Sequence, residues 1–209
     1  MIEDRARIIQ AMLAHVPFEG WSASALAATG RDLGLPEGAA ELAFPGGISD
    51  VLTVHLEEAD RQMLAGLAQH DLSVLKVRQK VALAIRLRLE QAAPHKEAVR
   101  RALALLATPR HAPLAPRALY RTVDAIWRAC GDRATDFNFY TKRGLLAAVY
   151  MATLLHWLDD RSEGHAATWA FLDRRIGEVM KIPQATGRLR GAIDRLPSPL
   201  RLWQRLRRA

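Results

Sequence analysis

Apolar residues recur along most of the chain at the three- and four-residue spacing of amphipathic α-helices. No segment shows the strict alternation, or the Val/Ile/Thr-rich runs between turn residues, that is typical of β-strands. The pattern predicts three short helices: one that ends near Pro17, one that Ser22 or Ser24 caps, and one that begins at Pro36. Longer helices are expected at about 47–67, from Asp71 or Ser73 to Pro94, and at 95–107, 117–131, 136–159 and 166–181. The chain is therefore expected to be all-α.

The most apolar stretch is the uncharged fifteen-residue run from Gly144 to Leu158. As a helix it spans roughly 22 Å, which is shorter than the hydrocarbon core of a bilayer, about 30 Å thick. We therefore expect a buried central helix and not a transmembrane span. The same helix could line an apolar ligand cavity.

Charge is distributed unevenly along the chain. The net charge is +8. Residues 1–50 carry three Arg against seven Asp and Glu, a net of −4, and residues 51–180 carry 19 Lys and Arg against 14 acids, a net of +5. Residues 181–209 carry eight Lys and Arg against one Asp, a net of +7. The tail thus holds most of the excess positive charge.

On a helical wheel, the tail separates apolar residues from arginines, and this pattern predicts an interfacial membrane helix. A tail docked on its own body, a partner-docking helix and a disordered basic tail remain as alternatives. A helix over 200–209 is about 15 Å long, so it can lie on a bilayer but cannot cross it. The predicted membrane-binding residues are Leu189, Ile193, Leu196, Leu200, Arg201, Leu202, Trp203, Arg205, Leu206 and Arg208.

We find no pattern of residues that indicates catalysis. The chain lacks a Gly-x-Ser-x-Gly elbow, a phosphate-binding Gly loop and a His-Glu-x-x-His pair. Its single cysteine, Cys130, excludes a cysteine-cluster zinc site. His156, Asp159 and Asp160 would share a helix face, but no second cluster completes a metal site, so a solvated helix end is the favoured interpretation. The sequence predicts a non-catalytic protein without a metal or a cofactor.

Residues 131–143 place three aromatic side chains among two carboxylates and two adjacent cations, Lys142 and Arg143. Asp136 is suited to the start of a helix, where a carboxylate interacts favourably with the helix dipole. Successive helical turns cannot bury all of the aromatic and charged residues that follow. Exposed aromatics beside Arg are typical of a protein-interaction hot spot.

The order of helices resembles the TetR-type architecture, with a helix-turn-helix-like headpiece (1–46), a helical ligand-binding and dimerisation body (47–182) and the basic tail (183–209). Residues 36–43, where a repressor would have its recognition helix, contain two carboxylates and no Lys or Arg. This composition disfavours nucleic acid as a partner. A TetR-type ligand-responsive transcriptional regulator is kept as the alternative, and a metal-dependent helical-bundle enzyme as a more distant one.

The chain also resembles the Coq-nine family, accessory proteins of ubiquinone (coenzyme Q) biosynthesis, in its bacterial form. The resemblance extends from Trp21 to about Ile182 and rests on several ordered motifs. These are LAFPGGISD (42–50), LKVRQK (75–80), RLRLE (86–90), RALALLATP (101–109), DAIW (124–127), GD (131–132), DFNFYTKR (136–143) and TWAFLDRRI (168–176).

The resemblance implies a TetR-like homodimer that does not regulate transcription and that holds an isoprenoid or phospholipid chain in its body. It implies binding to an anionic membrane surface through the tail, and presentation of quinone intermediates to the demethoxyubiquinone hydroxylase. A starting Met without a transit segment indicates a bacterial member on the cytoplasmic face of the inner membrane. The implied hydroxylase patch maps onto Ile126, Asp136, Phe139, Tyr140, Lys142 and Arg143, with Phe139 where many members have Trp. Periodicity alone suggests the lipid-binding residues Leu83, Leu87, Leu103, Leu106, Leu119, Val149 and Thr153.

Overall fold

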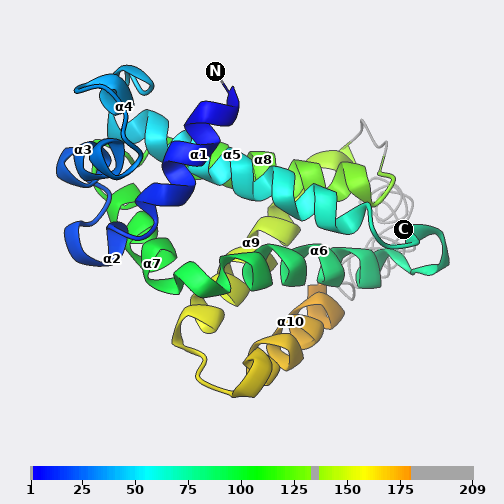
Figure 1. Cartoon of the computed structure of the whole chain (residues 1–209). Helices are drawn as coiled ribbons and strands as arrows, with labels where there is room; N and C mark the ends of the chain where they lie inside the picture. The colour runs from blue at the N-terminus through cyan, green and yellow to red at the C-terminus, as the bar shows by residue number, and fades with distance from the viewer. Residues whose placement is uncertain (1, 133–136, 180–209) are drawn as a thin grey trace, which may run out of the picture.

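The computed structural model describes residues 2–132 and 137–179, and this part of the chain is built from helices and turns (Figure 1). This confirms the predicted all-α class. The α-helices are α1 (Ile2–Met12), α2 (Val16–Glu19), α3 (Ala23–Asp32), α4 (Ala39–Leu42), α5 (Ile48–Leu67), α6 (Val77–Ala92), α7 (Lys96–Leu106), α8 (Leu114–Ala129), α9 (Phe137–Asp159) and α10 (Ala166–Val179). Three short 3₁₀ turns, η1 (Leu72–Val74), η2 (Ala93–His95) and η3 (Glu163–His165), lie between them.

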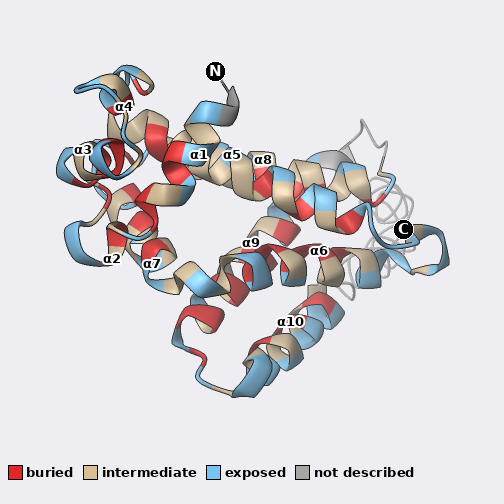
Figure 2. Cartoon of the chain, in the orientation of Figure 1, coloured by how far each residue is buried: buried red, intermediate tan, exposed pale blue. Residues whose placement is uncertain are grey.

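The buried side chains form two hydrophobic cores. Figure 2 marks the buried residues in red along the helices. The headpiece core unites α1, α3 and α4 with the first turns of α5 and with one face of α7. The body core is formed by the rest of α5 together with α6, α8, α9 and α10. Helix α5, about 30 Å long, contributes Val51 and Leu52 to the first core and Met63 and Leu67 to the second. It therefore connects the headpiece rigidly to the body.

The start of α3 agrees with the sequence prediction. Ser22 is its N-cap, and the Ser22 hydroxyl accepts a hydrogen bond from the amide of Ala25 at 3.1 Å. Two other predicted starts are wrong. Helix α4 begins at Ala39 and not at Pro36, because Gly38 adopts a left-handed conformation (φ 75°) that interrupts a helix. The chain from Asp71 forms only the turn η1, in which Asp71 accepts from the amide of Ser73, and α6 begins at Val77.

Helix α9 contains the uncharged run and packs against α8 and α10. Trp157 is fully buried, and Leu146 and Leu154 are nearly so. In the part of the chain that the structure describes, no helix has the length and apolar character needed to cross a membrane. The predicted basic tail, 183–209, with its helix over 200–209, lies outside the described residues.

Candidate functional site

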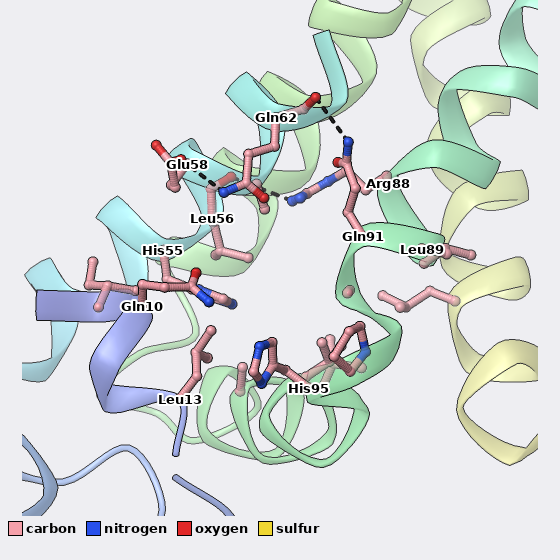
Figure 3. Close-up of a pocket in the computed structure, with 18 of the residues that line it drawn as sticks. Gln10, Leu13, His55, Leu56, Glu58, Gln62, Arg88, Leu89, Gln91 and His95 are labelled. Carbon is pink, nitrogen blue, oxygen red and sulfur yellow. Dashed lines mark hydrogen bonds between the residues drawn. The ribbon is translucent and has the colours of Figure 1, made fainter. Parts of the chain in front are cut away.

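A cavity of about 370 Å³ lies where the two cores meet, and we call it the seam pocket (Figure 3). Its walls come from α1, α5, α6, η2, α7 and α9. Ile9 of α1, Leu13 just after it, Leu103 and Leu106 of α7, and Leu154 of α9 make much of the surface apolar. Binding sites for small molecules are typically concave and apolar, with a few polar groups that orient the ligand. The seam pocket has this composition.

One side of the seam pocket is polar. Gln62 of α5 and Arg88 and Gln91 of α6 lie together there, and His95 lies across from them (Figure 3). The Gln91 side-chain amide donates to the backbone carbonyl of Gln62 at 3.1 Å, and the Gln62 amide donates to a carboxylate oxygen of Glu58 at 2.9 Å. These bonds hold both amides in place. We call Gln62, Arg88 and Gln91 the polar wall.

Arg88 is held by a buried ion pair behind the polar wall. Its side chain is only 6% exposed, and one terminal nitrogen lies 3.2 Å from Oδ1 of Asp60, itself 5% exposed. Asp60 also accepts from Nε of Arg121 at 2.9 Å and from the hydroxyl of Thr122 at 2.8 Å. The carboxylate thus fixes Arg88 at the edge of the pocket and links α5, α6 and α8.

The Arg88 side chain keeps one polar atom unsatisfied. Its Nε is buried and has no hydrogen-bond partner. A buried donor without an acceptor costs about 1–3 kcal/mol, so such atoms are uncommon in folded proteins.

His55 of α5 lies on the same pocket and is uncharged at neutral pH. Burial, reinforced by the nearby positive charge of Arg88, lowers the pKa of His55 from 6.5 to about 4. Its ring contacts Trp21 with centroids 4.8 Å apart, and Trp21 donates to the backbone carbonyl of Ala98 on α7. His55 therefore contributes a neutral polar group to the pocket.

The structure does not bring the seven predicted lipid-binding residues into one cavity. Leu103 and Leu106 line the seam pocket. Val149 lines a second cavity of about 450 Å³, and Leu83 lines a third one of about 570 Å³. Thr153 is fully buried, and its hydroxyl donates to the Val149 carbonyl. Leu87 and Leu119 are half-buried against the body core.

The second cavity lies at the end of the body where α6 begins and α8 and α10 end. Val77, Leu146, Val149 and Ile176 give it a largely apolar wall. Cys130 is part of that wall, and burial raises the pKa of its thiol to about 11, so the thiol stays protonated at neutral pH.

The predicted hydroxylase patch divides between core and surface. Ile126 is fully buried, and Arg143 is 4% exposed and paired with Asp124 at 2.6 Å, so neither side chain lies on the surface of this chain. Lys142 is partly exposed and pairs with Asp132 at 2.7 Å. Tyr140 is 70% exposed. Asp136 lies outside the described residues, and so does the side chain of Phe139.

Asp160, which the sequence places beside His156, has a structural role at the start of α10. It accepts hydrogen bonds from the backbone amides and hydroxyls of Ser162 and Thr168. Burial favours the neutral acid, but these bonds outweigh it and lower the pKa of Asp160 well below its usual value. Within the described residues, no group of three His, Cys, Asp or Glu side chains could hold a metal ion.

The periodicity of α5 and α6 contained a signal for the polar wall that the sequence analysis missed. The buried positions of α6 are Val81, Ala84, Ile85, Arg88 and Leu89, at spacings of three and four. A charged residue at a core-facing position of such a stripe requires a buried partner. Asp60 occupies the corresponding position of α5.

Comparison with known proteins agrees with the motifs found in the sequence. The family model for COQ9 matches residues 112–183, which cover α8, α9 and α10. The chain is 35% identical over 191 residues to the mitochondrial ubiquinone biosynthesis protein COQ9 of Drosophila melanogaster, and 34% identical over 186 residues to that of Homo sapiens. The predicted resemblance to the COQ9 family is confirmed.

The COQ9 relatives are longer than this chain. The alignment covers 90% of the chain and 58% of the Drosophila protein, and 84% of the chain and 57% of the human protein. The chain thus spans a little more than half the length of these relatives.

A solved structure supports the fold. The TetR transcriptional regulator from Nitrosomonas europaea ATCC 19718 superposes with a TM-score of 0.71, covering 85% of this chain and 98% of the regulator. This confirms the predicted TetR-like fold. At 20% sequence identity, the likeness extends to the fold alone.

Proposed function

We propose that this chain is a non-catalytic accessory protein of ubiquinone biosynthesis that binds an isoprenoid quinone intermediate or a phospholipid. The similarity to COQ9 supports the pathway. The observation that carries lipid binding is the seam pocket, whose apolar walls and polar side suit a molecule with a polar head and an apolar chain. Each methylene group that leaves water for such a site is stabilised by about 0.8 kcal/mol.

The experiment is mass spectrometry of organic extracts from the purified protein. We expect a lipid or isoprenoid quinone to co-purify at a substantial fraction of the protein concentration. Leu103→Trp, which fills the seam pocket, should reduce this fraction severalfold, whereas Ala104→Trp on the exposed face of α7 should not. If no lipid or isoprenoid quinone co-purifies with the wild-type protein, the proposal is wrong.

The second part of the proposal places the protein at the membrane surface as a homodimer that presents its ligand to the demethoxyubiquinone hydroxylase. The basic tail supports membrane binding, since each Lys or Arg near an anionic bilayer contributes about 1 kcal/mol. Exposed Tyr140 supports a partner surface at the start of α9. Phe139→Ala with Tyr140→Ala should weaken hydroxylase binding at least tenfold and leave the lipid content unchanged. Tyr120→Ala, at a half-exposed tyrosine on α8, is the control.

A further inference from the structure

The polar wall is a set of hydrogen-bonding groups that the fold itself leaves only partly used. The Gln62 and Gln91 amides are fixed by the bonds they donate to Glu58 and to a backbone carbonyl. Each amide still has a carbonyl oxygen and a second N–H hydrogen with which to bind a ligand. His95 contributes a ring nitrogen from the opposite side (Figure 3).

Arg88 supplies the strongest sign that something binds here. Its side chain is more than nine-tenths buried and lines the pocket, and its Nε–H has no acceptor. One of its two terminal nitrogens, Nη2, is already used, at 3.2 Å from Oδ1 of Asp60 and 3.5 Å from the carbonyl oxygen of Leu56. An oxygen of a molecule that packs against the Arg88 side chain would supply the acceptor that Nε lacks.

The charges around Arg88 indicate the chemistry of that molecule. Asp60 balances Arg88, and Arg121 is paired with Asp60 and with Glu57 at 3.1 Å. Glu58, which also lines the pocket, is paired with Arg61 on the outer side of α5. With the positive charge of Arg88 already neutralised and a carboxylate nearby, the site favours uncharged oxygen atoms over a phosphate group.

We propose that Gln62, Arg88 and Gln91 form a head-group subsite that binds the carbonyl or hydroxyl oxygens of an uncharged ring whose chain extends along Leu103 and Leu106. The inference rests on the proposed function and identifies the end of the pocket that recognises the ligand. Several converging donors suit a ring that carries several oxygens, because a simple chain alcohol offers only one. The volume of about 370 Å³ accommodates a ring and the first part of its chain, at the low end of the usual range for ligand pockets.

The experiment compares three probes that share one two-isoprene chain: a 1,4-benzoquinone, an alcohol without a ring, and a monophosphate. Isothermal titration calorimetry of the whole chain, freed of lipid, gives each dissociation constant. We expect the quinone to bind at least tenfold more tightly than the alcohol, and the monophosphate no more tightly than the alcohol. Tightest binding of the monophosphate would overturn the inference.

Two variants test the residues themselves. Arg88→Lys keeps a positive charge beside Asp60 but removes the Nε donor. Gln91→Leu replaces the amide with an apolar side chain of similar size. Each should weaken quinone binding about tenfold, the effect of one lost hydrogen bond, and leave alcohol binding within twofold. Gln69→Leu, on an exposed residue just beyond α5, is the control.

The outcomes separate the inference from the proposed function. If the alcohol and the quinone bind equally, or if the variants weaken both to the same extent, the head-group subsite is wrong while lipid binding stands. If no probe binds to the wild-type protein, both are wrong.

Discussion

Replacing Asp60 by Asn tests whether the ion pair behind the polar wall stabilises the fold. The carboxylate is 5% exposed and is the acidic partner of buried Arg88. Breaking a buried ion pair by removing one partner costs about 3–5 kcal/mol, because the other charge remains buried without compensation. Arg121 is 34% exposed and retains Glu57, so only Arg88 is left uncompensated. We therefore expect a loss near the lower limit, about 3 kcal/mol.

Such a loss is readily measured. For a chain of this size, about 1 kcal/mol corresponds to about 2–4 °C in melting temperature, so Asp60→Asn should lower the Tm by roughly 6–12 °C. Adding Arg88→Met should recover part of the loss, because apolar groups often replace both partners of a buried pair at little cost. Glu57→Gln, in an exposed pair, should cost less than about 1 kcal/mol. A stability loss below about 1 kcal/mol for Asp60→Asn would refute the reasoning. So would a stability loss in the double variant, Asp60→Asn with Arg88→Met, that equals the sum of the losses of the two single variants.

Three further predictions concern pH and the membrane. The folded pKa of His55 is about 4 and its unfolded value 6.5, so the unfolded state binds the proton first and stability falls, by up to about 3 kcal/mol, as the pH drops from 6.5 to 4. Urea denaturation at pH 7 and pH 4.5 measures this fall in stability. The fall should be smaller for His55→Gln than for the wild type, and the same as in the wild type for His70→Gln, at an exposed residue. Asp160→Asn should cost about 1.5–3 kcal/mol at pH 7. The cost should shrink as the pH falls below 3.8, because Asp160 of the unfolded wild type then binds a proton while the folded carboxylate, whose pKa is lowered, stays charged; a cost that does not depend on pH would contradict this. Replacing the arginines at 201, 205 and 208 by Glu should abolish flotation with anionic vesicles, and unchanged flotation would exclude the tail as the membrane contact.

The fold was more predictable than the ends of its elements. Apolar spacing identifies the helices because each buries one face, and this holds for α5 to α10. Helix starts depend on local backbone geometry, which residue type only partly determines. Ser22 caps α3 as expected, but the left-handed conformation of Gly38 displaces the start of α4, and Asp71 closes a turn instead of opening α6.

The candidate site was less predictable, because it lies between elements distant in the sequence. Periodicity shows that Leu103 and Leu106 face inward, and they line the seam pocket as Val149 lines another cavity. It does not show which inward faces are separated by a cavity and which pack tightly, as Thr153 does. Residues 131–143 illustrate the same limit: their composition suggested a surface, yet Arg143 turns inward to pair with Asp124.

The fold and the charge of the headpiece lead to opposite expectations for DNA binding, and charge should decide the outcome. The structural neighbour is a transcriptional regulator, but its 20% identity establishes only the fold. A protein that binds DNA gains much of its affinity from Lys and Arg that neutralise phosphates, and the loss of those contacts cannot be offset by shape. Residues 1–50 carry three Arg against seven acids, and Glu37 and Glu41 are exposed on either side of the start of α4. We therefore expect residues 1–182 to show no sequence-specific binding in a gel-shift assay at 150 mM salt. Any DNA binding by the whole chain should be non-specific and should weaken steeply as the salt concentration rises. It should be lost when the tail is removed. Tight, sequence-specific binding that survives removal of residues 183–209 would instead favour a regulator.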